Sequence, residues 1–137
     1  MSYNLLDHKT DLKIKVKAKT KEKLFQDACL AMSEAILPQK LGQYPEQEEV
    51  EVTVKAKTLE DLLVNFLNEV LYLGDVNNLS YRAKEFPNFS DKKLKAKLIG
   101  YSVPADQFTT EVKAATYHGL EIKKKDNRFE TTIIFDI

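Results

Sequence analysis

The sequence has little of what a disulfide-bonded, disordered or membrane-spanning protein needs. Its 137 residues include one Cys, four Gly, four Pro and no Trp. A single Cys cannot form an internal disulfide, and so few Gly and Pro residues are typical of a globular chain. No run approaches the ~18 consecutive apolar residues of a transmembrane helix, and residues 1–4 lack the basic and apolar regions of a signal peptide. We therefore expect a cytoplasmic protein that has no membrane partner.

The charge balance argues against direct nucleic-acid binding. The chain has 21 Lys and Arg residues against 21 Asp and Glu residues, so its formal net charge is zero. Most nucleic-acid binders neutralise phosphates with a strong positive field. We therefore expect any link to RNA to be indirect. The lysine runs at 13–19 and 122–125 are interpreted as solvated strand faces.

Standard enzyme motifs are missing as well. The chain has no Gly-rich phosphate loop, CxxC pair, HExxH helix or GxSxG elbow. Their absence argues against a self-sufficient hydrolase or a nucleotide-driven enzyme. Cys29 lies on the apolar face of a predicted helix, where burial favours an inert thiol over a reactive thiolate. We interpret Cys29 as a core residue.

An internal repeat organises the first half of the chain. Residues 16–24 read VKAKTKEKL, and residues 54–62 read VKAKTLEDL. In each copy apolar residues alternate with polar ones, the period of a strand that has one dry and one wet face. Thr20 and Thr58 then stand where a helix N-cap is needed, since a threonine oxygen can accept a bond from a first-turn amide. The repeat predicts two strand-cap-helix units.

The two predicted helices are followed by predicted strands. Apolar residues at helical spacing run from Thr20 to Pro38 and from Thr58 to Gly74. Strand patterns follow at 79–86, 92–102, 111–124 and 128–136. Their short connections favour antiparallel pairing. We predict an α+β fold, with residues 1–137 forming one two-layer domain whose two helices lie on one face of a mixed, mainly antiparallel sheet.

The end of the sequence places two carboxylates side by side. Asp136 is followed by Ile137, whose α-carboxylate adds a second negative charge. Two such groups held close repel each other unless a cation lies between them. Hard divalent cations prefer oxygen ligands, and Asp7 or Asp11 could complete the shell. A frayed, exposed terminus is the alternative that the residues leave open.

Several segments in the same order resemble the archease family. They extend across nearly the whole chain, and the Lys-Ala-x-Thr-Tyr-His segment and the terminal Asp-Ile are the most specific. The segments are LDHKTD at 6–11, DLL at 61–63, LNEVLY at 67–72, VKAATYHGL at 112–120 and FDI at 135–137.

The resemblance implies an accessory protein and not an enzyme. Archeases assist the GTP-dependent tRNA-splicing ligase of the RtcB type, promoting guanylylation of a ligase histidine and multiple turnover. The resemblance therefore implies an RtcB-type ligase as protein partner, and a divalent metal held by acidic residues. The matching ligands are Asp11, Asp136 and the terminal carboxylate of Ile137. Calcium is the expected metal in a crystal, and magnesium or manganese could act in function.

Three further residues are weaker candidates, for shaping this acidic cluster or for contacting the partner. They are His8, Lys113 and His118.

Three positions depart from the family pattern. The family commonly reads His-Thr-Ala-Asp-Ile-Gly, whereas this chain has Lys13 in place of the glycine. Gln26 replaces a frequent helix glutamate, and Tyr101 replaces the glutamate of a frequent Gly-Glu pair. Fewer acidic residues should weaken metal affinity, because the charge of the ligands tunes it.

Two other functions are compatible with the sequence. A chaperone-like binding module would act by contacts alone, with a structural metal or none. A small metal-dependent enzyme with its own substrate is a third possibility, which the missing nucleotide and nucleophile motifs disfavour. The oligomeric state is left open.

Overall fold

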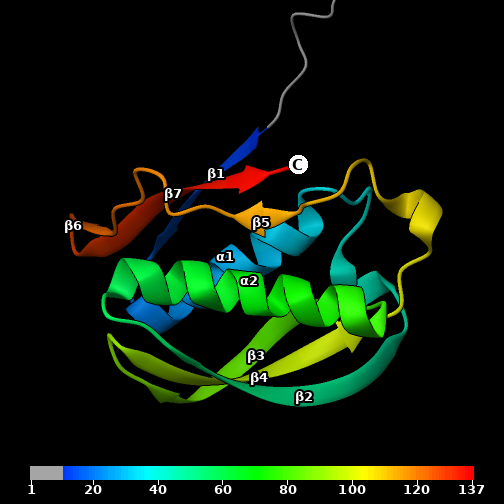
Figure 1. Cartoon of the computed structure of the whole chain (residues 1–137), viewed down its shortest axis with the longest axis horizontal. Helices are drawn as coiled ribbons and strands as arrows, with labels where there is room; N and C mark the ends of the chain where they lie inside the picture. The colour runs from blue at the N-terminus through cyan, green and yellow to red at the C-terminus, as the bar shows by residue number, and fades with distance from the viewer. Residues whose placement is uncertain (1–10) are drawn as a thin grey trace, which may run out of the picture.

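The computed structural model describes residues 11–137, which form two main helices, two short 3-10 turns and seven strands. Figure 1 shows their arrangement. In chain order the elements are β1 (Asp11–Ala18), α1 (Lys21–Glu34), η2 (Leu41–Gln43), β2 (Glu46–Lys55), α2 (Leu59–Asn77), β3 (Ser80–Phe89), β4 (Lys93–Tyr101), η3 (Ala105–Gln107), β5 (Ala114–Ala115), β6 (Lys123–Lys125) and β7 (Arg128–Asp136).

The two predicted strand-cap-helix units are confirmed. Thr20 caps α1 by accepting a bond from the amide of Lys23 at 3.0 Å. Thr58 caps α2 in the same way, accepting from the amide of Asp61 at 3.1 Å. Both threonines have extended backbone angles, as residues that precede a helix do. The same local sequence therefore produces the same local structure twice.

The α+β class is confirmed, but the strands form two sheets where the sequence suggested one. One sheet has the order β1-β7-β5, with β6 also pairing with β7, and the other has the order β2-β4-β3. Every pairing among residues 11–137 is antiparallel, so the sheets are not mixed. Both helices lie between the two sheets, so neither occupies an outer face (Figure 1).

The width of the apolar arc on α2 explains this arrangement. Leu62, Leu63 and Val64 are consecutive residues, and all three are fully buried, as are Phe66 and Leu67. Successive residues differ by 100° around a helix, so three in a row cannot all face one sheet. A helix that is apolar over so wide an arc must be covered on more than one side. The second sheet provides that cover.

The prediction of one continuous strand at 111–124 is wrong. Only Ala114–Ala115 and Lys123–Lys125 are strands, and a turn with Gly119 at a φ of +64° lies between them. Gly119 adopts the left-handed conformation that L side chains rarely take, so the chain bends here.

Two other boundaries also shift. Helix α2 continues past Gly74 to Asn77 and ends at the left-handed Asn78. Strand β3 extends past Pro87, which an edge strand can accommodate.

The core fills the space between the sheets. Phe25 of α1 packs against Phe66 of α2 and Phe89 of β3, with ring centroids 6.1 Å and 5.0 Å apart. Cys29 is fully buried here, as predicted, and burial raises the pKa of its thiol to about 12. In residues 11–137 no helix is long and apolar enough to cross a membrane.

Candidate metal centre

Strands β1 and β7 bring two of the predicted ligands together. Their antiparallel register places Asp11 directly opposite Asp136, although 125 positions separate them in sequence. The next pair is Leu12 and Phe135, and both pack into the core. Since side chains alternate along a strand, the two aspartates lie on the outer face of the sheet, away from the helices. Directly opposed Cβ atoms are about 4.5–5.5 Å apart, so the carboxylates are close neighbours.

The third predicted ligand, Ile137, directly follows this pair. Its side chain is half-buried and packs against the core. The amide of Lys113 donates to the carbonyl oxygen of Asp136 at 2.8 Å, which fixes the backbone just before Ile137. On the β5 side the partner of Asp136 is Ala114, whose methyl group covers little of the aspartate. Figure 1 shows the chain end beside β1 and β7.

Neither aspartate has a cationic partner within residues 11–137. Seven ion pairs occur in this part of the chain, and none includes Asp11 or Asp136. Lys13 is the next residue on the same face of β1, and it stands opposite Ile134. It is therefore a diagonal neighbour of Asp136. Among residues 11–137 the aspartate pair therefore has no ion-pair partner, and Lys13 is its diagonal neighbour.

The donor set suits a hard divalent cation, although it is small. The two aspartates, and the terminal carboxylate expected at Ile137, would supply oxygen only, which favours calcium, magnesium or manganese over softer metals. Residues 11–137 contain no group of three or more His, Cys, Asp or Glu side chains placed to hold a metal. Asp7 and His8 lie outside the described residues. A cation held by these three carboxylates would keep several waters, as magnesium commonly does.

Gln26 and Tyr101 serve packing at other places in the fold. The amide nitrogen of Gln26 donates to the carbonyl oxygens of Ala83 and Lys84 at 3.2 Å and 3.1 Å, which ties α1 to β3. Tyr101 is buried, and its hydroxyl accepts a bond from Arg82 at 2.8 Å. These two departures from the family pattern therefore lie at the β2-β4-β3 sheet, whereas Lys13 lies beside the aspartate pair.

The segment at 113–119 has a clear structural role. Asn68 of α2 accepts a bond from the amide of Ala115 at 2.7 Å and donates to its carbonyl oxygen at 3.0 Å. The Tyr117 hydroxyl donates to the side-chain oxygen of Asn65. The two Asn68 bonds hold β5 against α2. Sequence reasoning did not identify Asn65 and Asn68, although amides on a mostly apolar helix were a signal for such contacts.

The two other candidates in this segment are exposed. Lys113 contacts the site through its backbone amide, as described above, while its side chain is exposed. His118 is exposed in the turn that contains Gly119.

Comparison with known proteins identifies the family. The sequence model of the archease protein family matches residues 3–137. The chain belongs to the archease family. The archease of Methanosarcina barkeri is 33% identical over 141 residues, covering 98% of this chain and 95% of its own length. The archease of Thermoplasma volcanium is 32% identical over 139 residues, and each chain is covered completely.

Solved structures agree on the fold. A solution structure of a Methanobacterium thermoautotrophicum protein matches with a TM-score of 0.75 and 24% identity, covering 96% of this chain and 95% of that one. The crystal structure of an archease from Thermotoga maritima, described as a possible chaperone, matches with a TM-score of 0.66 and 19% identity, covering 100% and 98%. Archease membership makes this chain an accessory protein and not an enzyme in its own right.

Proposed function

We propose that this archease activates a GTP-dependent RNA ligase of the RtcB type, promoting guanylylation of the ligase and multiple turnover. The observation that carries the proposal is the register of β1 and β7, which sets Asp11 opposite Asp136, the residue before Ile137. This face is accessible to a docking ligase, because Asp136 is exposed and Asp11 is only partly buried. RNA contact would pass through the ligase, in keeping with the zero net charge.

In this proposal Asp11, Asp136 and the Ile137 carboxylate hold a divalent cation. Such a cation would supply positive charge that offsets the triphosphate of GTP and the departing pyrophosphate. The chain's own task is to present three carboxylates at one end of the β1–β7 strand pair, so that little ordering remains to be done when the ligase docks. Removing one carboxylate should therefore reduce stimulation without unfolding the protein.

Single-turnover guanylylation of the purified ligase tests this. Asp11→Asn and Asp136→Asn should each reduce stimulation at least about tenfold, since even the loss of an outer-shell partner costs about 10–100-fold in metal affinity or activity. Asp106→Asn is the matched control, because Asp106 is also exposed and lies in η3, away from this site. Wild-type stimulation by both folded site variants would rule out the proposed mechanism.

A contact-only, chaperone-like module is the second candidate. It is favoured by the small ligand set, since residues 11–137 hold no group of three ligand side chains. Calorimetric titration with calcium, magnesium and manganese separates the two candidates. A metal-holding activator should bind one of these ions and lose that binding in Asp136→Asn. A contact module, with a structural metal or none, should stimulate the ligase equally well as wild type and as Asp136→Asn.

A further inference from the structure

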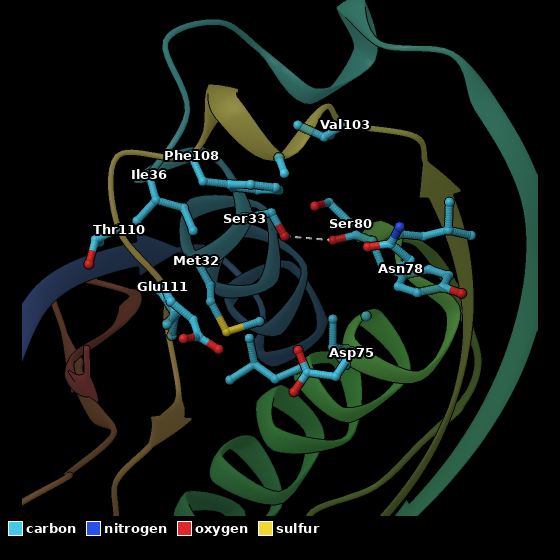
Figure 2. A pocket seen from close by; sticks show the side chains of 17 residues that line it. Met32, Ser33, Ile36, Asp75, Asn78, Ser80, Val103, Phe108, Thr110 and Glu111 are labelled. Atoms are coloured by element: carbon cyan, nitrogen blue, oxygen red, sulfur yellow. Dashed lines mark hydrogen bonds between the residues drawn. The ribbon is translucent and has the colours of Figure 1, made fainter.

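A pocket of about 470 Å³ has two acidic residues, Asp75 and Glu111, in its lining. It is bounded by the last turns of α1 and α2, the start of β3 and the segment 103–112 (Figure 2). Its volume is within the range of sites that hold small ligands. Neither Asp11 nor Asp136 lines it, so it is separate from the candidate metal centre.

The floor of the pocket is formed by apolar side chains that are almost fully buried. Met32 of α1, Val70 of α2 and Val112 line it, and their exposed fractions are 2%, 3% and 8%. The hydroxyl proton of Ser33 is not available to a ligand, because the hydroxyl donates to the carbonyl oxygen of Tyr81 at 2.7 Å. A ligand that reaches this floor must therefore carry an apolar portion.

The rim of the pocket is acidic. Asp75 of α2 and Glu111 are exposed lining residues, and Figure 2 shows their carboxylates on either side of the Met32 thioether. Of the described residues that line the pocket, none is Lys, Arg or His. Neither carboxylate forms an ion pair within residues 11–137. The rim therefore favours a positive charge.

Apolar floor and acidic rim together select an amphipathic cation. Lysine and arginine bury their methylene stems on apolar surface while the charged head stays near water. A hydrated divalent ion would gain nothing from the apolar floor, and an anion would be repelled by the rim. We propose that this pocket receives an arginine or lysine side chain, with an apolar neighbour, from the protein partner. That the partner is the ligase rests on the proposed function.

Two peptides that differ only in charge test the pocket without any ligase. The probes are acetyl-Leu-Arg-Leu-amide and the same peptide with neutral citrulline, titrated into the full chain and followed by amide chemical shifts in NMR spectra. The arginine peptide should bind about tenfold more tightly, because each exposed carboxylate contributes about threefold. Its shifts should cluster on pocket-lining residues. Equal affinity for the two peptides, or shifts confined to other surfaces, would overturn the proposal.

Substitutions assign the charge preference to the rim. Asp75→Asn and Glu111→Gln should each weaken the arginine peptide about threefold and leave the citrulline peptide unchanged. Asp106→Asn is again the control, since Asp106 lies in η3 next to the pocket without lining it. If the control weakens arginine binding as much as the rim variants do, general surface charge explains the preference and the pocket assignment fails.

The ligase assay then tests the partner. The Asp75→Asn, Glu111→Gln double variant should need about ten times more protein for half-maximal stimulation, with the same maximal rate. An unchanged half-maximal concentration would overturn the assignment of the pocket to the ligase. If the wild-type chain itself gives no stimulation, the proposed function fails, while the peptide titration still decides the chemistry of the pocket.

Discussion

Two acidic pairs on this molecule have the same charge and very different surroundings. Asp11 and Asp136 stand on the outer face of two strands, with Lys13 beside them. Asp75 and Glu111 stand at the rim of a pocket whose floor is buried and apolar. A divalent ion gains from several close oxygens, whereas an organic cation also gains from apolar contact. The comparison teaches that the neighbouring side chains, and not the negative charge alone, decide which cation each pair prefers.

One structural element connects these two regions. The segment 111–115 contributes Glu111 to the pocket rim, and its Lys113 amide bonds to Asp136. Asn68 holds this segment through both backbone groups of the buried Ala115. Displacing the segment should therefore disturb both regions together.

Asn68→Ala should have the largest effect. It leaves the Ala115 amide and carbonyl without partners, at a cost of about 1–3 kcal/mol of unfolding free energy. Urea unfolding measures this loss, and the two titrations described above should both weaken. Asn65→Ala is the matched control, because Asn65 bonds to the backbone of Lys55 and to the hydroxyl of Tyr117, but to no backbone group of the segment 111–115. If Asn68→Ala leaves both titrations unchanged, the two regions do not depend on this segment.

Local patterns explain how much of the fold could be predicted. Alternation and threonine caps gave the two strand-helix units because these features depend on adjacent residues. Strand pairing depends on residues far apart, so the division into two sheets was not predicted. The run of apolar residues at 62–64, all buried, indicated a second sheet, because a helix that is apolar on two sides must be covered on both. The short β5 was missed because Asn68 and β7 define it, not its own sequence.

The candidate metal centre could be proposed from the sequence, whereas the pocket could not. Asp136 and Ile137 are adjacent in sequence, and the resemblance to archeases adds Asp11, so this set could be proposed without coordinates. The structure adds that β1 and β7 align Asp11 with Asp136. The pocket has no such signal, because Asp75 and Glu111 come from segments that meet only in the folded chain. Its acidic rim could not be recognised from the sequence.

Extending the chain past Ile137 should have an effect of intermediate size, on metal binding and not on the pocket. A polypeptide that ends at Ile137 and one that carries an added C-terminal Gly should be compared in metal titrations. Extension moves the terminal charge about 3.3 Å along the strand direction, so affinity for calcium or manganese should fall about tenfold. Peptide binding in the pocket should not change. An N-terminal tag of the same length is the control, and equal losses from both tags would contradict a ligand role for the carboxylate.

Lys13→Ser should have the smallest effect, and in the opposite direction. Lys13 shares the outer face of β1 with Asp11 and is a diagonal neighbour of Asp136, so its charge repels a metal ion. Its removal should strengthen metal binding about threefold at low salt, and the gain should shrink as ionic strength rises because exposed charges are screened. Lys15→Ser is the matched control, since Lys15 lies one step further along the same face, opposite Thr132. A gain of equal size from Lys15→Ser would show that overall charge, and not the position of Lys13, governs metal affinity.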